Sequence, residues 1–437
     1  MKKRIVWGAI ALMLMAVAIG CSGDDEPQPV DNPPEDNEPT AYDDDTVRWK
    51  APVRIALSSA EKAMVTQSNA FAFNLFNVMV WGGAYGPCFQ KPQNLILSPL
   101  SITYALGMLN NGAAGDTQAQ INNVLGFGDT GADGINTFCK RLMDSIPLVD
   151  PRVRLKIANN IYVNKGYELK DDFVTKAKNY YSAQPETRDF ADGNTRNVIN
   201  KWVSNYTNGM IPELIKSSEF NPAAVSYLLN AIYFRASWTD EFNKKKTHDD
   251  VFKTVSGNKI PCKMMHSERN TFYTETSNMQ VVRLGYGSDI FTMTIFLPKH
   301  PDATPRMPTI DEWNNLRFTT DAIVDLDLPR FKTDTDITLN GVLEILGMTD
   351  AFSAKADFRN FCDQPTYISL IKQAARISVD EEGTEASAAT AIGLATANIG
   401  EKTEPERKTF RADHSFSYVI SERQTGAILF LGQYVGE

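Results

Sequence analysis

The stretch Tyr227–Trp238 restricts the possible folds of this chain more than any other, because it is an almost continuous apolar run. A strand with apolar side chains on both of its faces has to lie inside a sheet that is covered on both sides. The rest of the chain therefore has to cover this strand twice, and we expect Tyr227–Trp238 to be a buried strand of a large body.

One large domain is expected from Trp49 to the C-terminus, over residues 49–437. About 390 residues would by length alone suggest two or three domains. No second linker rich in Pro, Gly or Ser interrupts this part of the chain, however, and it contains no internal repeat. A single unit therefore fits the composition better than several.

Apolar periodicity and turn residues predict several other helices and strands. The predicted helices are Asn69–Phe76, which ends near Gly82–Gly83, Thr103–Asn110, which ends at Gly112, and a helix around Asn200 that ends near Gly209. The predicted strands are Asn94–Ile102, which is stopped by Ser98–Pro99, Lys156–Val163, Ile377–Val379, and a C-terminal hairpin of Ser417–Ile420 and Gly426–Gly432.

The N-terminus has the form of a secretory signal. A basic start precedes the apolar run Ile5–Gly20, which is too short for a comfortable membrane span. Ala18–Cys21 resembles a bacterial lipobox, although Ala18 stands where Leu is usual. The resemblance implies that residues 1–20 are a lipoprotein signal peptide and that Cys21 carries the lipid. The alternative is an ordinary signal peptide followed by a chance cysteine.

Residues 21–48 are predicted to form a disordered tether after the lipidated Cys21, because prolines alternate with acidic residues and Asn up to about Asp45. Ser22–Glu26 resembles the acidic export tag of surface lipoproteins in Bacteroides-like bacteria, or is simply the start of an acidic linker. The tether carries much of the formal net charge of −9, so this charge says little about the domain. No basic patch indicates nucleic-acid binding.

The stretch Glu381–Ile392 combines helix-favouring Ala and Glu with Thr, Ile and Gly, and it has no helical apolar stripe. A period of two fits it. The face that starts at Thr384 is small and weakly apolar, whereas the opposite face is partly polar. Gly383 precedes this alternation and can adopt backbone angles that other residues avoid. The residues alone fit either a strand of this kind or a solvated linker.

Taken with Phe410–His414, Glu381–Ala391 resembles the hinge and reactive-centre loop of an inhibitory serpin, over residues 381–409 in all. About nine tenths of the chain shares motifs with that family, in the family's order. The resemblance implies an α+β serpin fold with three β-sheets, surrounding helices and an exposed loop that can insert into the central sheet. It also implies that the hinge consists of Glu381, Glu382, Gly383, Thr384, Glu385, Ala386, Ser387, Ala388, Ala389 and Thr390.

By the family's register, the resemblance places the reactive bond of the loop between Ala397 and Asn398. A shift of one residue in that register would make Thr396 or Asn398 the residue that is cut. Ala395 and Thr396 precede it, and these small residues suit elastase-like or subtilisin-like serine proteases. Lys402 is an alternative bait for trypsin-like enzymes. Cysteine proteases are further targets that the resemblance allows.

The resemblance also assigns a small "shutter" beneath the central sheet to Ser98 and Ser101, with Asn230 nearby, and places Trp238 where the loop enters. Counting back from Glu381, Gln373 stands where the family usually has a shutter histidine. Gln can donate and accept hydrogen bonds, so we expect the sheet to close, without protonation-dependent switching at this position. Ser98 as a nucleophile is less consistent with the sequence than Ser98 as a packed, hydrogen-bonded residue, because no G-x-S-x-G surrounds it. The loop is also about five residues longer than in common family members, and Ser415 replaces the usual Pro.

Nothing in the sequence indicates an enzyme, a cofactor or a metal site. None of the four His lies in H-E-x-x-H or four residues from another, and no phosphate-binding Gly-rich loop is present. With Cys21 lipidated, the four remaining cysteines permit three pairings, and we expect free, mostly buried thiols instead. They are Cys88, Cys139, Cys262 and Cys362.

The expected function is therefore that of a monomeric suicide-substrate inhibitor of serine proteases, held at the outer membrane and exposed on the cell surface by its lipid anchor alone. The alternative, from another functional class, is a non-inhibitory serpin that acts as a binding or structural protein. Such members commonly carry charged or bulky inward residues in the hinge. The small residues after Gly383 favour inhibition.

Overall fold

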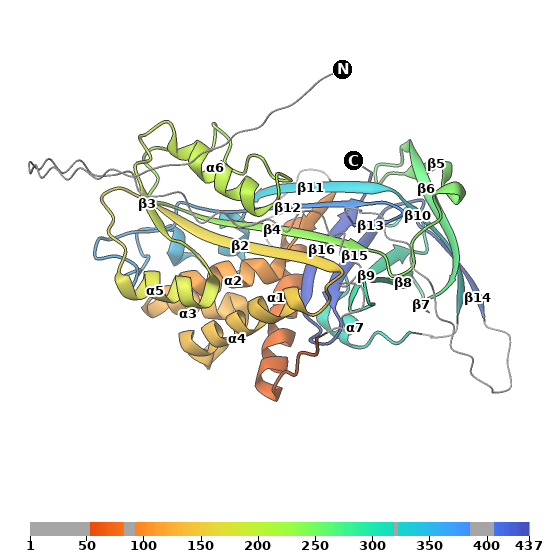
Figure 1. The fold of residues 1–437 in the computed structure, drawn as a ribbon, viewed down its shortest axis with the longest axis horizontal. Helices are drawn as coiled ribbons and strands as arrows, with labels where there is room; N and C mark the ends of the chain where they lie inside the picture. The colour runs from red at the N-terminus through yellow and green to blue at the C-terminus, as the bar shows by residue number, and fades with distance from the viewer. Residues whose placement is uncertain (1–52, 83–91, 319–321, 385–405, 437) are drawn as a thin grey trace, which may run out of the picture. The chain divides into compact units, whose positions relative to one another are not determined.

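Three β-sheets and the helices packed against them make up the part of the chain that this computed structural model describes, residues 53–82, 92–318, 322–384 and 406–436 (Figure 1). The chain from Asp45 to Glu437 clusters as a single unit. The signal peptide and the tether lie outside the described residues.

The central sheet has six strands in the order β11-β12-β13-β4-β2-β3. Its long middle strand, β4, spans Ser226–Ser237 and is buried over almost its whole length, which confirms the prediction made for the apolar run. It pairs antiparallel with β2 from end to end. The other strands of this sheet are β2 Val153–Asn164, β3 Glu186–Arg188, β11 Phe331–Thr338, β12 Leu370–Val379 and β13 Gly383–Thr384.

The second sheet has the order β1-β16-β15-β9-β8-β7, and the third sheet the order β14-β10-β6-β5. The predicted C-terminal hairpin is confirmed, since β15 and β16 pair antiparallel in the core of the second sheet. The strands of the second sheet are β1 Leu95–Leu97, β7 Phe272–Glu275, β8 Met279–Tyr286, β9 Phe291–Pro298, β15 Phe416–Glu422 and β16 Ile428–Tyr434. The third sheet contains β5 His248–Lys253, β6 Lys259–Asn270, β10 Ile323–Pro329 and β14 Arg407–Arg411.

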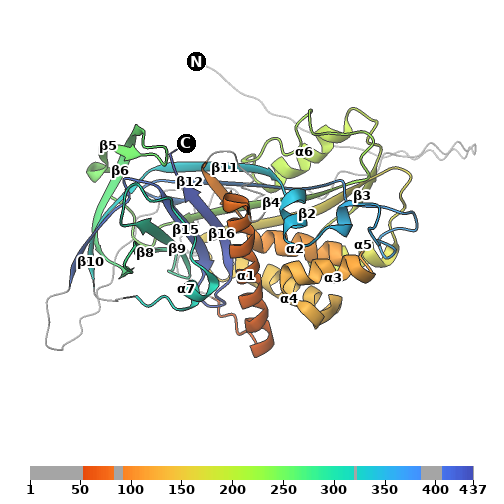
Figure 2. The same ribbon diagram turned by 180° about the vertical axis from the view of Figure 1, so that it is seen from behind.

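Helices cover the two faces of the central sheet unequally. Helices α1 to α5 gather on one face, whereas α6 lies on the other, as both views show (Figures 1 and 2). Every residue of α2 is buried, because this helix lies against β2, β4 and β16. The helices are α1 Ser59–Trp81, α2 Pro99–Asn110, α3 Gly115–Leu125, α4 Gly131–Ser145, α5 Asp171–Tyr181, α6 Thr195–Tyr206, α7 Ile310–Asn314 and α8 Asn340–Ile345.

Three predicted boundaries were wrong. The strand predicted at Ile377–Val379 begins at Leu370, since β12 pairs with β4 from that residue onward. Helix α1 begins at Ser59, ten residues before the predicted start, because Ser58 and Glu61 form a capping box there. Pro99 does not stop a long strand but opens α2, since the first turn of a helix needs no backbone N–H from that residue. The strand before it is accordingly shortened to Leu95–Leu97.

Candidate functional site

The two middle strands of the central sheet, β12 and β4, separate part-way along their length. They pair in parallel from Leu370 to Ala374 on β12 and from Tyr227 to Ala231 on β4. Beyond that point no direct pairing joins the two strands in the described part of the sheet. At the far end the short strand β13 lies between them. We call this line between β12 and β4 the seam.

Strand β13 occupies the open end of the seam with only two residues. Thr384 pairs with Val379 of β12 on one side and with Ala236 of β4 on the other. Gly383 has a φ of +151°, and a Cβ there would lie 2.2 Å from the carbonyl oxygen of Ala236. Only glycine fits this approach of two backbones.

Thr384 points into the interior, as the alternation in the sequence predicts. It is 1% exposed, and its hydroxyl lies 2.7 Å from the hydroxyl of Tyr286. The ring of Tyr286 stacks on Trp238 at 4.3 Å, and the indole N–H of Trp238 donates to the carbonyl oxygen of Asp380 at 2.8 Å. Trp238 therefore holds the turn that leads into β13.

A buried carboxylate fixes the same turn. Glu381 is 1% exposed and accepts hydrogen bonds from the guanidinium of Arg330 at 2.7 and 3.0 Å and from the hydroxyl of Thr247 at 2.5 Å. Burial alone would raise the pKa of Glu381, but these hydrogen bonds and the positive charge of Arg330 outweigh burial and hold the pKa below its ordinary value. Glu382 forms an ion pair with Lys244.

A polar cluster lies beneath the part of the seam where β12 and β4 pair with each other. The side-chain amide of Gln373 donates to the carbonyl oxygen of Ser98 at 3.0 Å, to the hydroxyl of Ser101 at 3.1 Å and to Oδ1 of Asn230 at 2.6 Å. Its oxygen accepts from the backbone N–H of Ser98 at 3.1 Å. Because Gln373 belongs to β12 and Asn230 to β4, this amide ties the two strands together.

Ser98 differs from the prediction in one respect. Its backbone is hydrogen-bonded to Gln373, as just described, but its buried hydroxyl has no hydrogen-bond partner in the described structure. Tight packing at the start of α2 fixes the backbone and leaves the hydroxyl unpaired. Ser101, by contrast, donates to Oδ1 of Asn230 at 2.7 Å.

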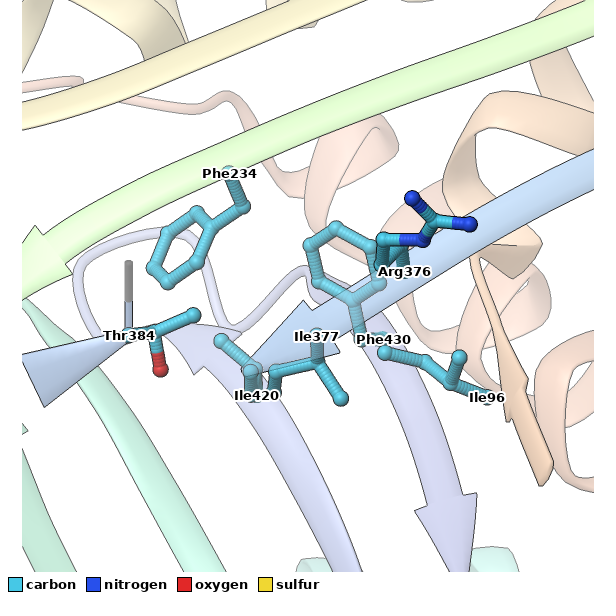
Figure 3. A pocket seen from close by; sticks show the side chains of 7 residues that line it. All are labelled: Ile96, Phe234, Arg376, Ile377, Thr384, Ile420 and Phe430. Carbon is cyan, nitrogen blue, oxygen red and sulfur yellow. The ribbon is translucent and has the colours of Figure 1, made fainter. Parts of the chain in front are cut away.

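A narrow gap, too small to hold a water molecule, lies in the open part of the seam, just beyond Thr384 (Figure 3). It is partly open to solvent and has apolar walls apart from Thr384 and Arg376. The lining residues come from β12, β4, β13 and the second sheet beneath them; they are Ile96, Phe234, Arg376, Ile377, Thr384, Ile420 and Phe430. The space continues the line of β13 between the two strands.

Comparison with known proteins agrees with this arrangement. A model of the serpin (serine protease inhibitor) family matches residues 66–436. The chain belongs to the serpin family. Most serpins inhibit proteases rather than catalyse reactions, and some, such as thyroxine-binding globulin, are not inhibitors.

Relatives from distant organisms share most of the serpin domain. A serpin-like protein of Methanosarcina mazei is 30% identical over 378 residues, which cover 85% of this chain and 86% of the relative. Neuroserpin of Gallus gallus is 31% identical over 360 residues, or 79% of this chain and 86% of the relative.

Solved serpin structures superpose closely. The native state of the thermophilic serpin tengpin has a TM-score of 0.75 at 29% identity, covering 89% of this chain and 97% of tengpin. Thyroxine-binding globulin in complex with thyroxine has a TM-score of 0.72 at 28% identity, covering 86% and 99% of the two chains. These structures confirm the predicted α+β serpin fold with three sheets.

In this serpin both ends of the predicted loop, 381–409, lie in described elements. Residues 381–384 are bound to the sheet, and β14 begins at Arg407 and pairs with β10. The remaining hinge residues from Glu385 to Thr390, the reactive bond and Lys402 lie outside the described residues.

Three residues of the site escaped the sequence analysis. Arg330 and Thr247 bind Glu381, and Tyr286 binds Thr384, yet each lies far from its partner in the chain. No local pattern marks them. One signal in the sequence could have indicated a partner of this kind: a carboxylate near Gly383, such as Glu381, needs a cation beside it if it is buried.

The described residues contain no group of three or more His, Cys, Asp or Glu side chains that could hold a metal ion. Cys139, Cys262 and Cys362 are free thiols, as predicted, and two of them are buried. Burial raises the pKa of the Cys139 thiol to about 12, which keeps it unreactive.

Gly383→Ala tests the fit of β13. A Cβ would collide with the backbone of β4, so we expect a loss of about 1–3 kcal/mol in the free energy of unfolding, or expulsion of the turn from the seam. Denaturant titration measures the first outcome, and a change in tryptophan fluorescence around Trp238 measures the second. Gly166→Ala is the control, because Gly166 also has a positive φ, +98°, but open space around its Cβ. Equal effects of the two substitutions would contradict the fit argument.

Glu381→Gln tests the buried carboxylate. Its folded-state pKa is depressed, so its stabilising contribution is full above the ordinary value of 4.5 and is lost as the pH falls below it. We expect a cost of about 1–2 kcal/mol at pH 7, modest because Arg330 is half-exposed, and convergence of variant and wild type in acid. Unfolding titrations across this pH range measure it. Glu268→Gln, in the exposed pair with Arg407, should change nothing, and a constant deficit for Glu381→Gln at all pH values would exclude the ionic explanation.

Proposed function

We propose that this serpin is a suicide-substrate inhibitor of serine proteases, of elastase-like or subtilisin-like specificity. The observation that carries the proposal is the position of Thr384, the first small inward residue of the hinge, which is already seated in an open seam. Up to the level of Ala374, a strand that continues from Thr384 would meet no direct pairing between β12 and β4; beyond it the two strands would have to separate.

The register of β13 predicts where such a strand would run. Continued in step with Thr384, residue 386 would lie between Ile377 and Phe234, which line the gap. A small side chain such as Ala386 suits that position, whereas a charged one would have to be desolvated. Further along, residue 390 would lie between Gln373 and Asn230. The hydroxyl of Thr390 could then replace the bond that these two side chains make with each other.

The proposed inhibition is a race between two rates. The serine Oγ of the protease attacks the carbonyl carbon of Ala397, the amino group of Asn398 leaves with a proton supplied by the protease's base, and an ester acyl-enzyme remains. The freed loop then inserts along the seam and carries the protease with it. If insertion distorts the protease's active site before water attacks the ester, the protease is trapped.

A non-inhibitory serpin is the alternative, and thyroxine-binding globulin is one among the similar structures. Its prediction would be a hinge that cannot enter the sheet. The seating of Thr384 and the small residues that follow it support inhibition instead.

The proposal extends to location and partners. Cys21 would carry a lipid, residues 22–48 would act as a tether, and the domain would act as a monomer at the outer surface of the outer membrane. No helix in the described residues is long and apolar enough to cross a membrane. Metabolic labelling with a fatty acid, compared between wild type and Cys21→Ser, tests the anchor.

Incubation with a protease panel tests the function. We expect pancreatic elastase to form an equimolar complex that survives boiling in detergent, with a released peptide that begins at Asn398. Trypsin should cut after Lys402 and escape, because about five extra residues leave about 16 Å of slack in the tether to the acyl-enzyme. Intact-mass analysis distinguishes these products. Turnover by every elastase and subtilisin without a trapped species would refute inhibition, and a stable trypsin complex would refute the register.

Thr384→Arg tests the insertion step. Because Thr384 is already seated in the seam, an arginine there would bury an unpaired guanidinium beside Tyr286, at a cost of several kcal/mol, so β13 should leave the seam. Insertion would then have to bury residue 384 again, and should slow while the loop stays cleavable. The number of inhibitor molecules consumed per trapped elastase should rise several-fold. Thr384→Ser keeps the hydroxyl and a small volume, and should behave as wild type. Unchanged stoichiometry in Thr384→Arg would show that insertion does not need residue 384 in the seam.

A further inference from the structure

A lysine on β12 is buried between two carboxylates. The side chain of Lys372 is 1% exposed, and its ammonium lies 2.9 Å from Oδ1 of Asp336 and in direct contact with Oε2 of Glu219. Asp336 belongs to β11, whereas Glu219 lies in the segment between α6 and β4, residues 207–225. An ammonium this deeply buried has to be paired to be tolerated.

A second lysine extends these ion pairs to four charged residues, joined in a ring by three ion pairs and one backbone hydrogen bond. Lys216, in the same segment as Glu219, lies 3.0 Å from Oδ2 of Asp336. Its backbone N–H donates to Oε2 of Glu219 at 3.0 Å. We call Glu219, Lys372, Asp336 and Lys216 the charge ring. It lies on the face of the central sheet that α6 covers.

The charge ring crosses the seam. Lys372 and Asp336 belong to strands on one side of it, whereas residues 207–225 run directly into β4 on the other. Helix α6 holds that segment, since the side chain of Asn200 accepts from the backbone N–H groups of Leu214 and Ile215, both at 2.9 Å.

Helix α6 itself is packed chiefly on the β4 side of the seam. Ile199 and Val203 lie in one buried cluster with Tyr162 of β2 and Leu229 of β4. Strand β12 contributes Ala374 and the partly buried Leu370. Figure 1 shows α6 over this face, beside the end of β11. The pairs Lys372–Glu219 and Lys216–Asp336 therefore join two parts of the molecule that an inserting strand would separate.

A third contact crosses the seam closer to β13. Arg376 of β12 donates from Nη1 to the carbonyl oxygen of Met210, in the same segment 207–225. Its Nε lies 2.5 Å from Asp334 of β11, and its side chain lines the gap beyond Thr384. Arg376 thus ties the segment to β12 just where the strands part.

We propose that the charge ring, with Arg376, is a latch that limits how fast β12 separates from β4, and so regulates the insertion step of the proposed function, on which this inference rests. Insertion of one strand would move β12 and β11 away from β4 by about 4.8 Å. The two pairs that cross the seam would then break. Lys372 would keep Asp336, and Glu219 would keep the backbone N–H of Lys216. The ammonium of Lys216 and the carboxylate of Glu219 are partly exposed, so water can solvate both.

This arrangement explains why the latch is ionic. If Lys372 had Glu219 as its one partner, opening would leave a buried ammonium unpaired, and the seam would be locked. If the contacts were absent, only the paired half of the strands and Gln373 would resist opening. With four charges, the ion pairs resist the separation of β12 from β4, but the open state does not bury an unpaired charge.

The test compares the double variant Glu219→Gln, Lys216→Met with wild type. Both substitutions remove charges that lie on the β4 side, so Lys372 keeps Asp336 and the fold keeps its buried pair. Glu213→Gln is the matched control, because Glu213 is in the same segment but pairs with Arg196 of α6, on the same side of the seam. The readout is amide hydrogen exchange of the intact protein in peptides that cover residues 228–235 and 371–378.

We expect roughly tenfold faster exchange in these peptides for the double variant and no change for the control. This readout needs no protease, so it is independent of inhibition. Unchanged exchange in the double variant, or equal acceleration in the control, would overturn the latch even if elastase is trapped.

The trapping assay then connects the latch with function. The double variant should convert more quickly to an inactive, heat-resistant form during storage, and should trap a larger fraction of a protease that wild type traps poorly. Accelerated exchange in a protein that traps no protease would keep the latch and refute the inhibitor. Accelerated exchange together with unchanged trapping and storage behaviour would refute the regulatory role.

Discussion

The structure depends on a sheet whose central strands are not fully paired. Backbone N–H and C=O groups in the interior need partners, and a protein normally satisfies them by closing its sheets. Here β12 and β4 close only from Leu370 to Ala374 on β12, and two residues of β13 fill the far end. Between these points β12 and β4 do not pair directly with each other in the described structure. An unpaired edge accepts another strand readily, which is normally a hazard for a protein.

The side chains around the seam divide its two faces by chemistry. On the inner face, Gln373 joins the strands through neutral hydrogen bonds within a packed layer. On the face under α6, charged groups join them through a segment that is outside the sheet. Neutral bonds beneath and ionic bonds above resist the same motion, but only the ionic bonds depend on salt and on exposed partners. The amide of Gln373 does not titrate, so its hydrogen bonds across the seam do not depend on pH.

The pattern of apolar and polar residues along the chain predicted the parts of the fold and site in which burial alone decides where a side chain points. The apolar run of β4 predicts burial on both faces, and the alternation after Gly383 correctly orients Thr384. It failed where partners come from distant segments. Neither Arg330 beside Glu381 nor Glu219 beside Lys372 follows from spacing, because each pair joins strands or loops that meet only after folding. The predicted start of α2 was wrong for another reason, since a proline is compatible both with the end of a strand and with the first turn of a helix.

The contacts across the seam also have an order, which follows from the register. A strand that continues from Thr384 would pass Arg376 first, then Gln373, and then Lys372, because β13 runs antiparallel to β12. Each tie would be met only after the previous one has released. A sheet that opened all at once would lose every tie before any new backbone bond had formed. Opened in sequence, each step breaks one set of side-chain contacts and forms new backbone bonds of about 0.5–1.5 kcal/mol each, so no single barrier has to carry the whole cost.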